Sequence, residues 1–145
     1  MIYPKTDVNS FNLNLHKPYM KTAHDLVTAA KSHIQEIPLD LAQSDILRAD
    51  ILIDVREKDE FLNGHIAGAV HIPRGLLEFK LSATPEFGTR DLNIVLYCKS
   101  GGRAALCALA LQEMGYLKVS SIAGGIDAWI ESGRAVVKPE IIAFE

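Results

Sequence analysis

One cysteine stands where its neighbours in the sequence could make it reactive. Cys98 follows the apolar run 94–97, a predicted strand, and begins the segment 98–103, which leads into a predicted helix. Gly101 and Gly102 permit backbone angles that other residues avoid, so the amide N–H groups of this segment can point inward and hold an anion. The positive end of the following helix strengthens that field. Together these features favour a thiolate over a thiol, which makes Cys98 the candidate nucleophile.

The candidate substrate-binding groups are the residues that follow the cysteine in this segment: Lys99, Ser100, Gly101, Gly102 and Arg103. Lys99 and Arg103 can attract an anionic substrate, and Arg103 can also guard the pocket or brace it from behind. A thiolate in an electropositive cradle suits small sulfur-containing or oxyanion substrates. A persulfide, which is more acidic than a thiol, would be held as an anion by the same N–H groups.

The chain has two cysteines, Cys98 and Cys107. A cysteine that ends an apolar strand is often only a small core residue, but the glycine pair and Arg103 count against that interpretation of Cys98. Cys107 stands between Leu106 and Ala108 in a predicted helix, and its predicted role is structural. The sequence has neither a CxxC pair nor a Cys/His cluster at zinc spacing, so we expect no disulfide scaffold, no metal and no cofactor. This cysteine usage favours a reducing, cytoplasmic location.

The elements that must position Cys98 follow from hydrophobic patterning. The predicted strands are residues 33–37, 51–55, 69–72, 93–97 and 119–122. The helices predicted between and after them are residues 39–48, 56–62, 102–114 and 126–131. This alternation indicates an α/β fold with a mainly parallel sheet and helices on both faces. In such a sheet Cys98 lies at the carboxyl end of its strand, where these folds bind ligands.

An extension precedes this domain. The apolar positions that follow Pro18 have helical spacing: Tyr19, Met20, Ala23, Val27 and Ala30. The sequence therefore predicts an N-terminal extension over residues 1–32 with one amphipathic helix, a domain over 33–138 and a tail over 139–145. The extension could be a docking surface, a dimer contact or a cover for the sheet, and we expect a monomer or a weak dimer.

Composition argues against several classes of function. Of the 145 residues, 48% are hydrophobic and 23% are charged, which is typical of a globular domain with a substantial core. The formal net charge is −3, and lysines and arginines form no basic stripe, so no nucleic-acid partner is expected. The apolar stretches are far shorter than a membrane span, so no membrane partner is expected either.

Four stretches of the sequence together resemble the rhodanese homology domain family. They are residues 52–57 with Glu60 and Phe61, residues 64–69 leading to Ile72 and Pro73, residues 98–104, and residues 124–129. In order and spacing they span about residues 33–135. The resemblance implies a five-stranded parallel sheet flanked by helices, with Cys98 as the catalytic residue.

The activity implied by this resemblance is that of a thiosulfate sulfurtransferase. The Cys98 thiolate would take a sulfane sulfur from a donor such as thiosulfate, carry it as a persulfide, and pass it to a thiophilic acceptor. Cyanide, a small thiol or a protein thiol could serve as that acceptor. The expected partners are therefore small sulfur donors and thiophilic acceptors.

Two charged residues at the end of the strand 51–55 are candidate supporting residues. Asp54 and Arg56 stand next to the predicted position of the cysteine loop. A buried Asp54 that accepts N–H bonds from the loop, or an Arg56 paired with Glu60, would hold the shape of the pocket.

The remaining candidate supporting residues come from two glycine-containing motifs. Gly124, Gly125 and Trp129 are predicted to form one wall of the pocket, although Trp129 could equally be a core residue. His65 is predicted to fix a turn, since a thiolate of low pKa needs no separate general base.

Two other functions compete with sulfur transfer. Phosphatases and arsenate reductases related to this fold use a similar loop, usually with five residues between cysteine and arginine. Here four residues separate Cys98 from Arg103 and the next residue is Ala104, which favours an attacked sulfur over a bound phosphate. The second alternative is a non-catalytic, regulatory interaction module, against which the retained cysteine and the intact Gly-Gly-Arg sequence argue.

Overall fold

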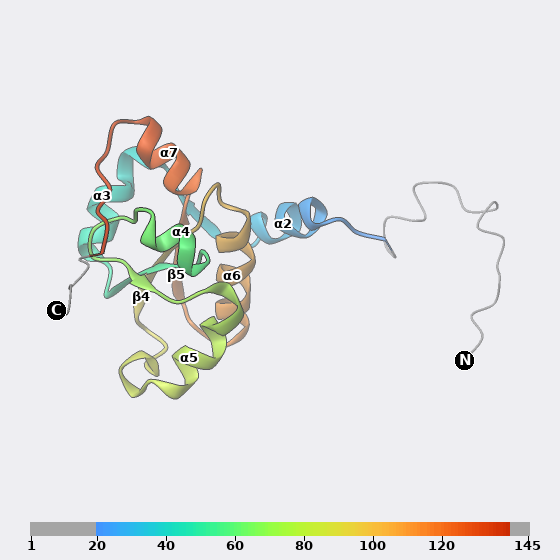
Figure 1. Cartoon of the computed structure of the whole chain (residues 1–145). Coiled ribbons are helices and arrows are strands. Elements are labelled where there is room, and N and C mark those ends of the chain that lie inside the picture. Colours follow the sequence, from blue (N-terminus) through green and yellow to red (C-terminus); the bar gives the residue numbers. More distant parts are fainter. Residues whose placement is uncertain (1–19, 140–145) are drawn as a thin grey trace, which may run out of the picture.

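A five-stranded parallel sheet forms the centre of the protein in a computed structural model that describes residues 20–139 (Figure 1). In spatial order the strands are β1 (Gln35–Ile37), β5 (Lys118–Ile122), β4 (Asn93–Tyr97), β2 (Ile51–Asp54) and β3 (Val70–His71). Each neighbouring pair runs parallel. The predicted α/β class and parallel sheet are confirmed.

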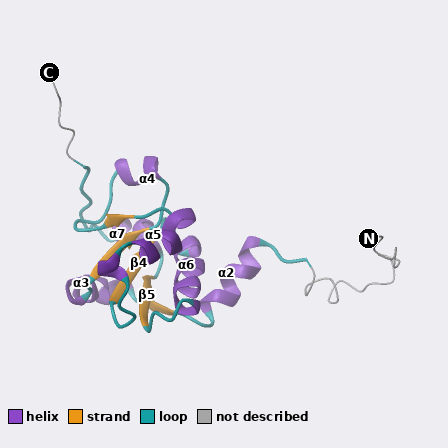
Figure 2. Cartoon of the chain, turned by 90° about the horizontal axis from the view of Figure 1, so that it is seen from below, coloured by secondary structure: helices purple, strands orange, loops and turns teal. Residues whose placement is uncertain are grey.

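Helices cover both faces of the sheet (Figure 2). They are α2 (Ala23–Lys31), α3 (Leu39–Arg48), α4 (Lys58–Leu62), α5 (Leu77–Ala83), α6 (Gly102–Glu113) and α7 (Gly125–Glu131), with short 3₁₀ turns η2 (Arg74–Leu76) and η3 (Pro85–Phe87) flanking α5. The helices α5 and α6 pack on one face, and α3 and α7 pack on the other. Among residues 20–139, no helix is long and apolar enough to cross a membrane.

The central strand β4 shows how the sequence divides between the two cores. Successive side chains of a strand point to opposite faces. Accordingly, Ile94 and Leu96 lie in the cluster beneath α5 and α6, whereas Val95 and Tyr97 lie in the cluster beneath α3 and α7. Cys98 continues the first series, and its side chain therefore lies on the face that α6 covers.

The helix predicted in the extension is present, but it begins later than expected. Thr22 caps α2: its hydroxyl accepts the N–H of Asp25 at 3.1 Å, and its own N–H donates to the Asp25 carboxylate at 3.0 Å. This reciprocal capping box fixes the first helical residue at Ala23. Met20 therefore precedes the helix, while Pro18 and Tyr19 lie outside the described residues.

Two further boundaries differ from the prediction for local reasons. The strand predicted from residue 33 starts at Gln35, because the N–H of His33 still donates to Ala30 at the end of α2. The helix predicted from residue 56 starts at Lys58, because Glu57 is its N-cap and forms a capping box with Glu60.

Candidate active site

The Cys98 loop, residues 98–103, begins where β4 ends. The register pairs Tyr97 of β4 with Asp54, the last residue of β2, so the carboxyl ends of the two central strands share one edge of the sheet. Cys98 itself is 1% exposed. Because α6 begins at Gly102, the loop runs directly into the first turn of that helix. The arrangement of strand, loop and helix is as the sequence predicts.

Two backbone N–H groups converge on the sulfur of Cys98. The nitrogen of Gly101 lies 3.1 Å from Sγ and that of Ala104 lies 3.3 Å from it, and both donate to it. Gly101 has a φ of 116°, in the left-handed region that favours glycine. The Ala104 N–H belongs to the first turn of α6, so the positive end of the helix also faces the sulfur. These donors stabilise negative charge on Sγ.

The start of α7 holds the loop from a second side. The N–H of Ile126 donates to the carbonyl of Cys98 at 2.9 Å, and that of Asp127 donates to the carbonyl of Lys99 at 3.0 Å. Gly125 lies closest: a Cβ atom on it would stand 2.5 Å from the Lys99 oxygen and 2.6 Å from the Cys98 oxygen. Gly124 precedes it at a φ of 75°. The Gly124 nitrogen lies 3.9 Å from the position of a Cβ atom on Gly101, so both predicted glycines lie next to the loop.

Both cations of the loop are engaged in ion pairs. Arg103 donates to the two carboxylate oxygens of Glu60 at 2.6 and 2.9 Å, a bidentate pair that ties α6 to α4. Lys99 donates to Asp127 at 2.9 Å, on the exposed side of the loop. Ser100, between them, is exposed. Of the two roles predicted for Arg103, guarding the pocket or bracing it, the ion pair with Glu60 favours the second.

Asp54 and Arg56 form a buried pair, which corrects both contacts predicted for them. The guanidinium of Arg56 donates to the Asp54 carboxylate from Nε at 3.1 Å and from a terminal nitrogen at 2.8 Å, and the Arg56 backbone N–H donates to the same carboxylate at 2.9 Å. Asp54 is therefore occupied by Arg56 and not by N–H groups of the cysteine loop. Glu60, the predicted partner of Arg56, pairs with Arg103 because α4 faces α6.

This buried pair links the end of β2 to Gly64 and to Tyr97, the residue before Cys98. A terminal nitrogen of Arg56 also donates to the carbonyl of Gly64 at 2.7 Å, and the guanidinium lies 5.8 Å from the ring centroid of Tyr97. The hydroxyl of Tyr97 accepts the N–H of Ile66 at 3.0 Å. Burial, together with the nearby negative charge of Asp54, raises the pKa of Tyr97, which keeps this hydroxyl neutral. Tyr97 is thus held by the hydrogen bond to its neutral hydroxyl and by its contact with Arg56, whose charge is compensated by Asp54.

Comparison with known proteins places this geometry in a family. The sequence model of the rhodanese-like domain family matches residues 38–132 of this chain. The chain belongs to the rhodanese-like domain family. A sulfurtransferase of Allochromatium vinosum is 34% identical to it over 90 residues, which cover 62% of this chain and 80% of that protein. Chloroplastic thiosulfate sulfurtransferase 16 of Arabidopsis thaliana is 32% identical over 106 residues, which cover 67% of this chain and 88% of that one. These relatives support a sulfurtransferase activity.

A solved structure shares the fold over most of the chain. A protein of Rhodopseudomonas palustris, described as of unknown function and a possible tyrosine phosphatase, matches with a TM-score of 0.72 at 30% identity. The match covers 81% of this chain and 96% of that one. Since the family match identifies the fold as rhodanese-like, the geometry of the loop must distinguish between the chemistries that this fold can carry.

Trp129 and His65 make contacts that are typical of residues with a structural role. Trp129, for which the sequence allowed either a wall of the cysteine pocket or a core position, lies in the core beneath α3 and α7, where its Nε1 donates to the carbonyl of Ala135 at 2.9 Å. The ring of His65 stacks on that of Phe61 with 4.0 Å between centroids, and its backbone pairs with Val137. These contacts make His65 a structural residue, but it lies in an isolated bridge to Val137 and not in the predicted turn.

The second cysteine is buried within α6. Cys107 is 2% exposed and lies in the core beneath that helix. Burial raises the pKa of Cys107 to about 12. Its thiol is therefore protonated at neutral pH, as the predicted structural role requires.

The ion pair between Glu60 and Arg103 makes stability depend on pH in a defined range. The hydrogen bonds from Arg103, aided by the Glu57 N–H and nearby positive charge, lower the pKa of Glu60 from 4.5 to about 2 against the opposing effect of burial. A carboxyl group with a lowered pKa in the folded state stabilises the fold above its unfolded pKa and loses that contribution as pH falls. We expect the wild type to lose stability relative to Glu60→Gln between about pH 4.5 and 2.

Urea unfolding of both proteins at several pH values, at constant ionic strength, measures this difference. Other carboxyl groups titrate in both proteins, so the difference between their unfolding free energies isolates Glu60. A difference that stays constant from pH 6 to pH 2 would contradict the assignment, which rests on the lowered pKa of Glu60.

Proposed function

We propose that this rhodanese-like domain transfers a sulfane sulfur from a donor such as thiosulfate to a thiophilic acceptor through a persulfide on Cys98. The observation that carries the proposal is the pair of N–H groups, from Gly101 and Ala104, that donate to Sγ at the start of α6. The same donors suit a thiolate and a persulfide, since both carry negative charge on sulfur.

In the first step the Cys98 thiolate attacks the outer sulfur of thiosulfate. A bond forms between Sγ and that sulfur while the sulfur–sulfur bond of the donor breaks, and its electron pair leaves on sulfite. The reactants and the products carry the same total charge, so the step needs no added proton, oxidant or reductant. Its products are sulfite and a Cys98 persulfide anion.

In the second step an acceptor attacks the terminal sulfur of the persulfide. Cyanide would leave as thiocyanate, and a thiolate would leave as a persulfide, and in either case Cys98 returns to the thiolate. Over the full cycle the oxidation state of Cys98 is therefore unchanged. Small thiols and the cysteine of a protein both satisfy this chemistry.

Phosphate transfer fits the loop less well. A phosphate held in the loop would need donors that converge on several oxygens, and a bidentate guanidinium is the side chain best suited to this. Arg103 instead uses its guanidinium on both oxygens of Glu60. The loop also has four residues between Cys98 and Arg103. These features favour a single sulfur atom as the group that is bound.

The mass of the intact protein after incubation with thiosulfate tests the proposal. We expect wild type to become heavier by one sulfur atom and to lose that mass when cyanide is added. Cys98→Ala should show no such change, whereas Cys107→Ala should behave as wild type because the Cys107 thiol is buried and protonated.

Three outcomes would overturn the proposal. They are an unchanged wild-type mass with every sulfane donor tried, an adduct that persists in Cys98→Ala, and an adduct that cyanide and thiols cannot remove. Hydrolysis of p-nitrophenyl phosphate that depends on Cys98 would point to the phosphatase alternative. An unmodified wild type that folds normally would instead point to a non-catalytic interaction module.

A further inference from the structure

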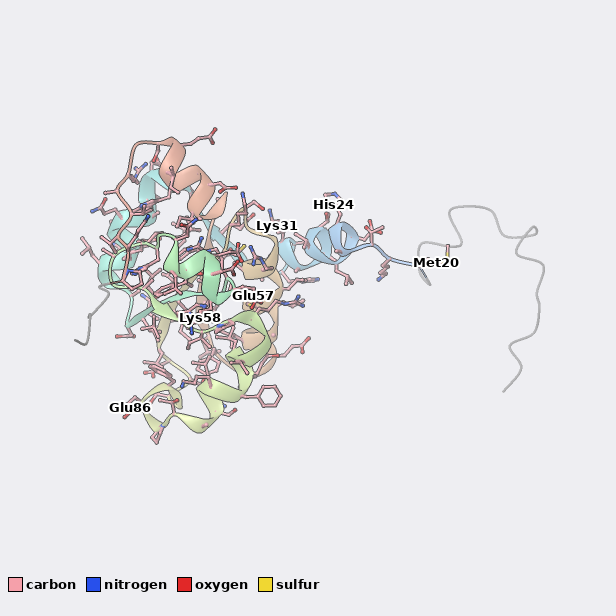
Figure 3. All side chains as sticks on the ribbon, viewed as in Figure 1. Met20, His24, Lys31, Glu57, Lys58 and Glu86 are labelled. Atoms are coloured by element: carbon pink, nitrogen blue, oxygen red, sulfur yellow. The ribbon has the colours of Figure 1, made fainter. Side chains whose placement is uncertain are left out.

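The helix that precedes the matched family region brings a lysine to the Cys98 loop. α2 ends at Lys31, whereas the family match starts at residue 38. The ammonium Nζ of Lys31 lies 3.7 Å from the position that a Cβ atom would take on Gly101. Gly101 is the residue whose N–H donates to the cysteine sulfur. Figure 3 shows Lys31 at the end of α2 that meets α6.

Packing fixes this end of α2 in place. Ala30, next to Lys31, has no exposed surface, and a methyl carbon of Val27 lies 3.5 Å from the position of a Cβ atom on Gly102. Figures 1 and 2 both show α2 beside α6, with its other end projecting from the domain. The position of Lys31 next to the loop therefore follows from contacts between α2 and the first residues of α6.

The charge of Lys31 is less engaged than the charges of the loop itself. Lys99 and Arg103 lie within hydrogen-bond distance of their carboxylates, at 2.9 and 2.6 Å. Lys31 lies 3.6 Å from the carboxylate of Glu36, which is longer than a charge-assisted hydrogen bond. Its side chain is 37% exposed, so its three N–H donors can reach a ligand from solvent.

We propose that Lys31 binds the anionic group of the sulfur donor at the rim of the Cys98 loop. The inference rests on the proposed sulfur transfer and assigns its donor to the class of small anions, such as thiosulfate. Because Gly101 has no side chain, no side chain of that residue separates the Lys31 ammonium from the backbone of the loop. Glu36, whose carboxylate oxygen lies 3.9 Å from the same Cβ position on Gly101, competes with the donor for Lys31.

Steady-state kinetics with thiosulfate and cyanide test the role of Lys31. We expect Lys31→Gln to raise KM for thiosulfate by about fivefold and to leave kcat within about twofold, as for the loss of one partly screened charge. Lys31→Glu should raise KM further. Glu36→Gln should lower KM severalfold, because it removes the competing carboxylate.

A second donor and a control lysine separate binding of charge from a general effect. Methanethiosulfonate carries one negative charge where thiosulfate carries two, so its KM should respond less to Lys31→Gln. Lys21→Gln removes the same charge from just before the opposite end of α2, a helix of nine residues that is about 13 Å long. Its KM should match wild type. Added salt should reduce the difference between wild type and Lys31→Gln.

The outcomes distinguish this inference from the proposed function. If wild type forms no persulfide, the proposed function fails and the kinetics lose their basis. If wild type and Lys31→Gln both form the persulfide with equal KM for thiosulfate, the role of Lys31 is wrong while sulfur transfer stands. Equal effects of Lys31→Gln and Lys21→Gln would also overturn it, since they would reflect net charge alone.

Discussion

Gly125→Ala is expected to destabilise the protein by about 2–5 kcal/mol and to slow persulfide formation strongly. Gly125 has a φ of 60°, and a Cβ atom there would stand 2.5 Å from the backbone oxygen of Lys99. The left-handed conformation costs about 1–2 kcal/mol in a residue with a side chain, and overpacking a fixed site adds about 1–3 kcal/mol. The backbone of the Cys98 loop must move, because the clash is with its carbonyl groups.

Gly133→Ala is the matched control for this prediction. Gly133 follows α7 at a φ of 85°, but a Cβ atom on it would meet no atom within 4 Å. The substitution should therefore cost only the conformational strain of about 1–2 kcal/mol and leave persulfide formation unchanged. Urea unfolding and intact mass after thiosulfate measure both effects. Equal losses of stability in the two variants would show that the contact between α7 and the loop adds nothing to the cost of the Gly125 substitution.

The sequence was informative about the loop because its signals are local. A buried strand, two glycines and a helix start occur within a few residues of Cys98, and their geometry depends little on the rest of the chain. The Gly124–Gly125 turn was likewise readable, because its backbone conformation suits glycine and its motif has a fixed place in the family pattern.

The choice of ion-pair partners was not readable in the same way. Arg56, Glu57 and Glu60 stand within five positions of one another, and Arg103 is distant in the sequence. Which carboxylate meets which guanidinium depends on how α4 is turned toward α6. That orientation is set by tertiary packing, so the sequence permitted a pair between Arg56 and Glu60 that the fold replaces with two others.

Two positions were left undetermined or misplaced by the sequence, for different reasons. The start of α2 could have been found, since Thr22 and Asp25 have the spacing of a capping box, but Pro18 and the apolar positions after it suggested an earlier start. The position of Trp129 could not, because α7 has seven residues and its short pattern does not determine which side faces the loop. In the same way, a contact between Lys31 and the loop depends on how α2 docks on α6.

Asp54→Ala is expected to cost about 3–5 kcal/mol, because it leaves the guanidinium of Arg56 buried without its counter-charge. Asp54 has no exposed surface and Arg56 is 6% exposed. Burial alone would lower the pKa of Arg56, but the hydrogen bonds and charge of Asp54 outweigh it and raise that pKa. Arg56 therefore remains charged, and the variant must hydrate or expel it, which would disturb its contact with Gly64. Urea unfolding measures the loss.

Two controls determine whether this cost comes from an uncompensated buried charge. Asp45→Ala removes the carboxylate that pairs with Arg48, whose side chain is 70% exposed, and should cost less than about 1 kcal/mol. The double variant Asp54→Asn with Arg56→Met removes both charges and keeps an acceptor oxygen for the backbone N–H of residue 56. It should be more stable than Asp54→Ala, because no buried charge is left unpaired. A double variant that is less stable than Asp54→Ala would show that the hydrogen bonds of Arg56, and not its charge, hold this edge of the sheet beneath Cys98.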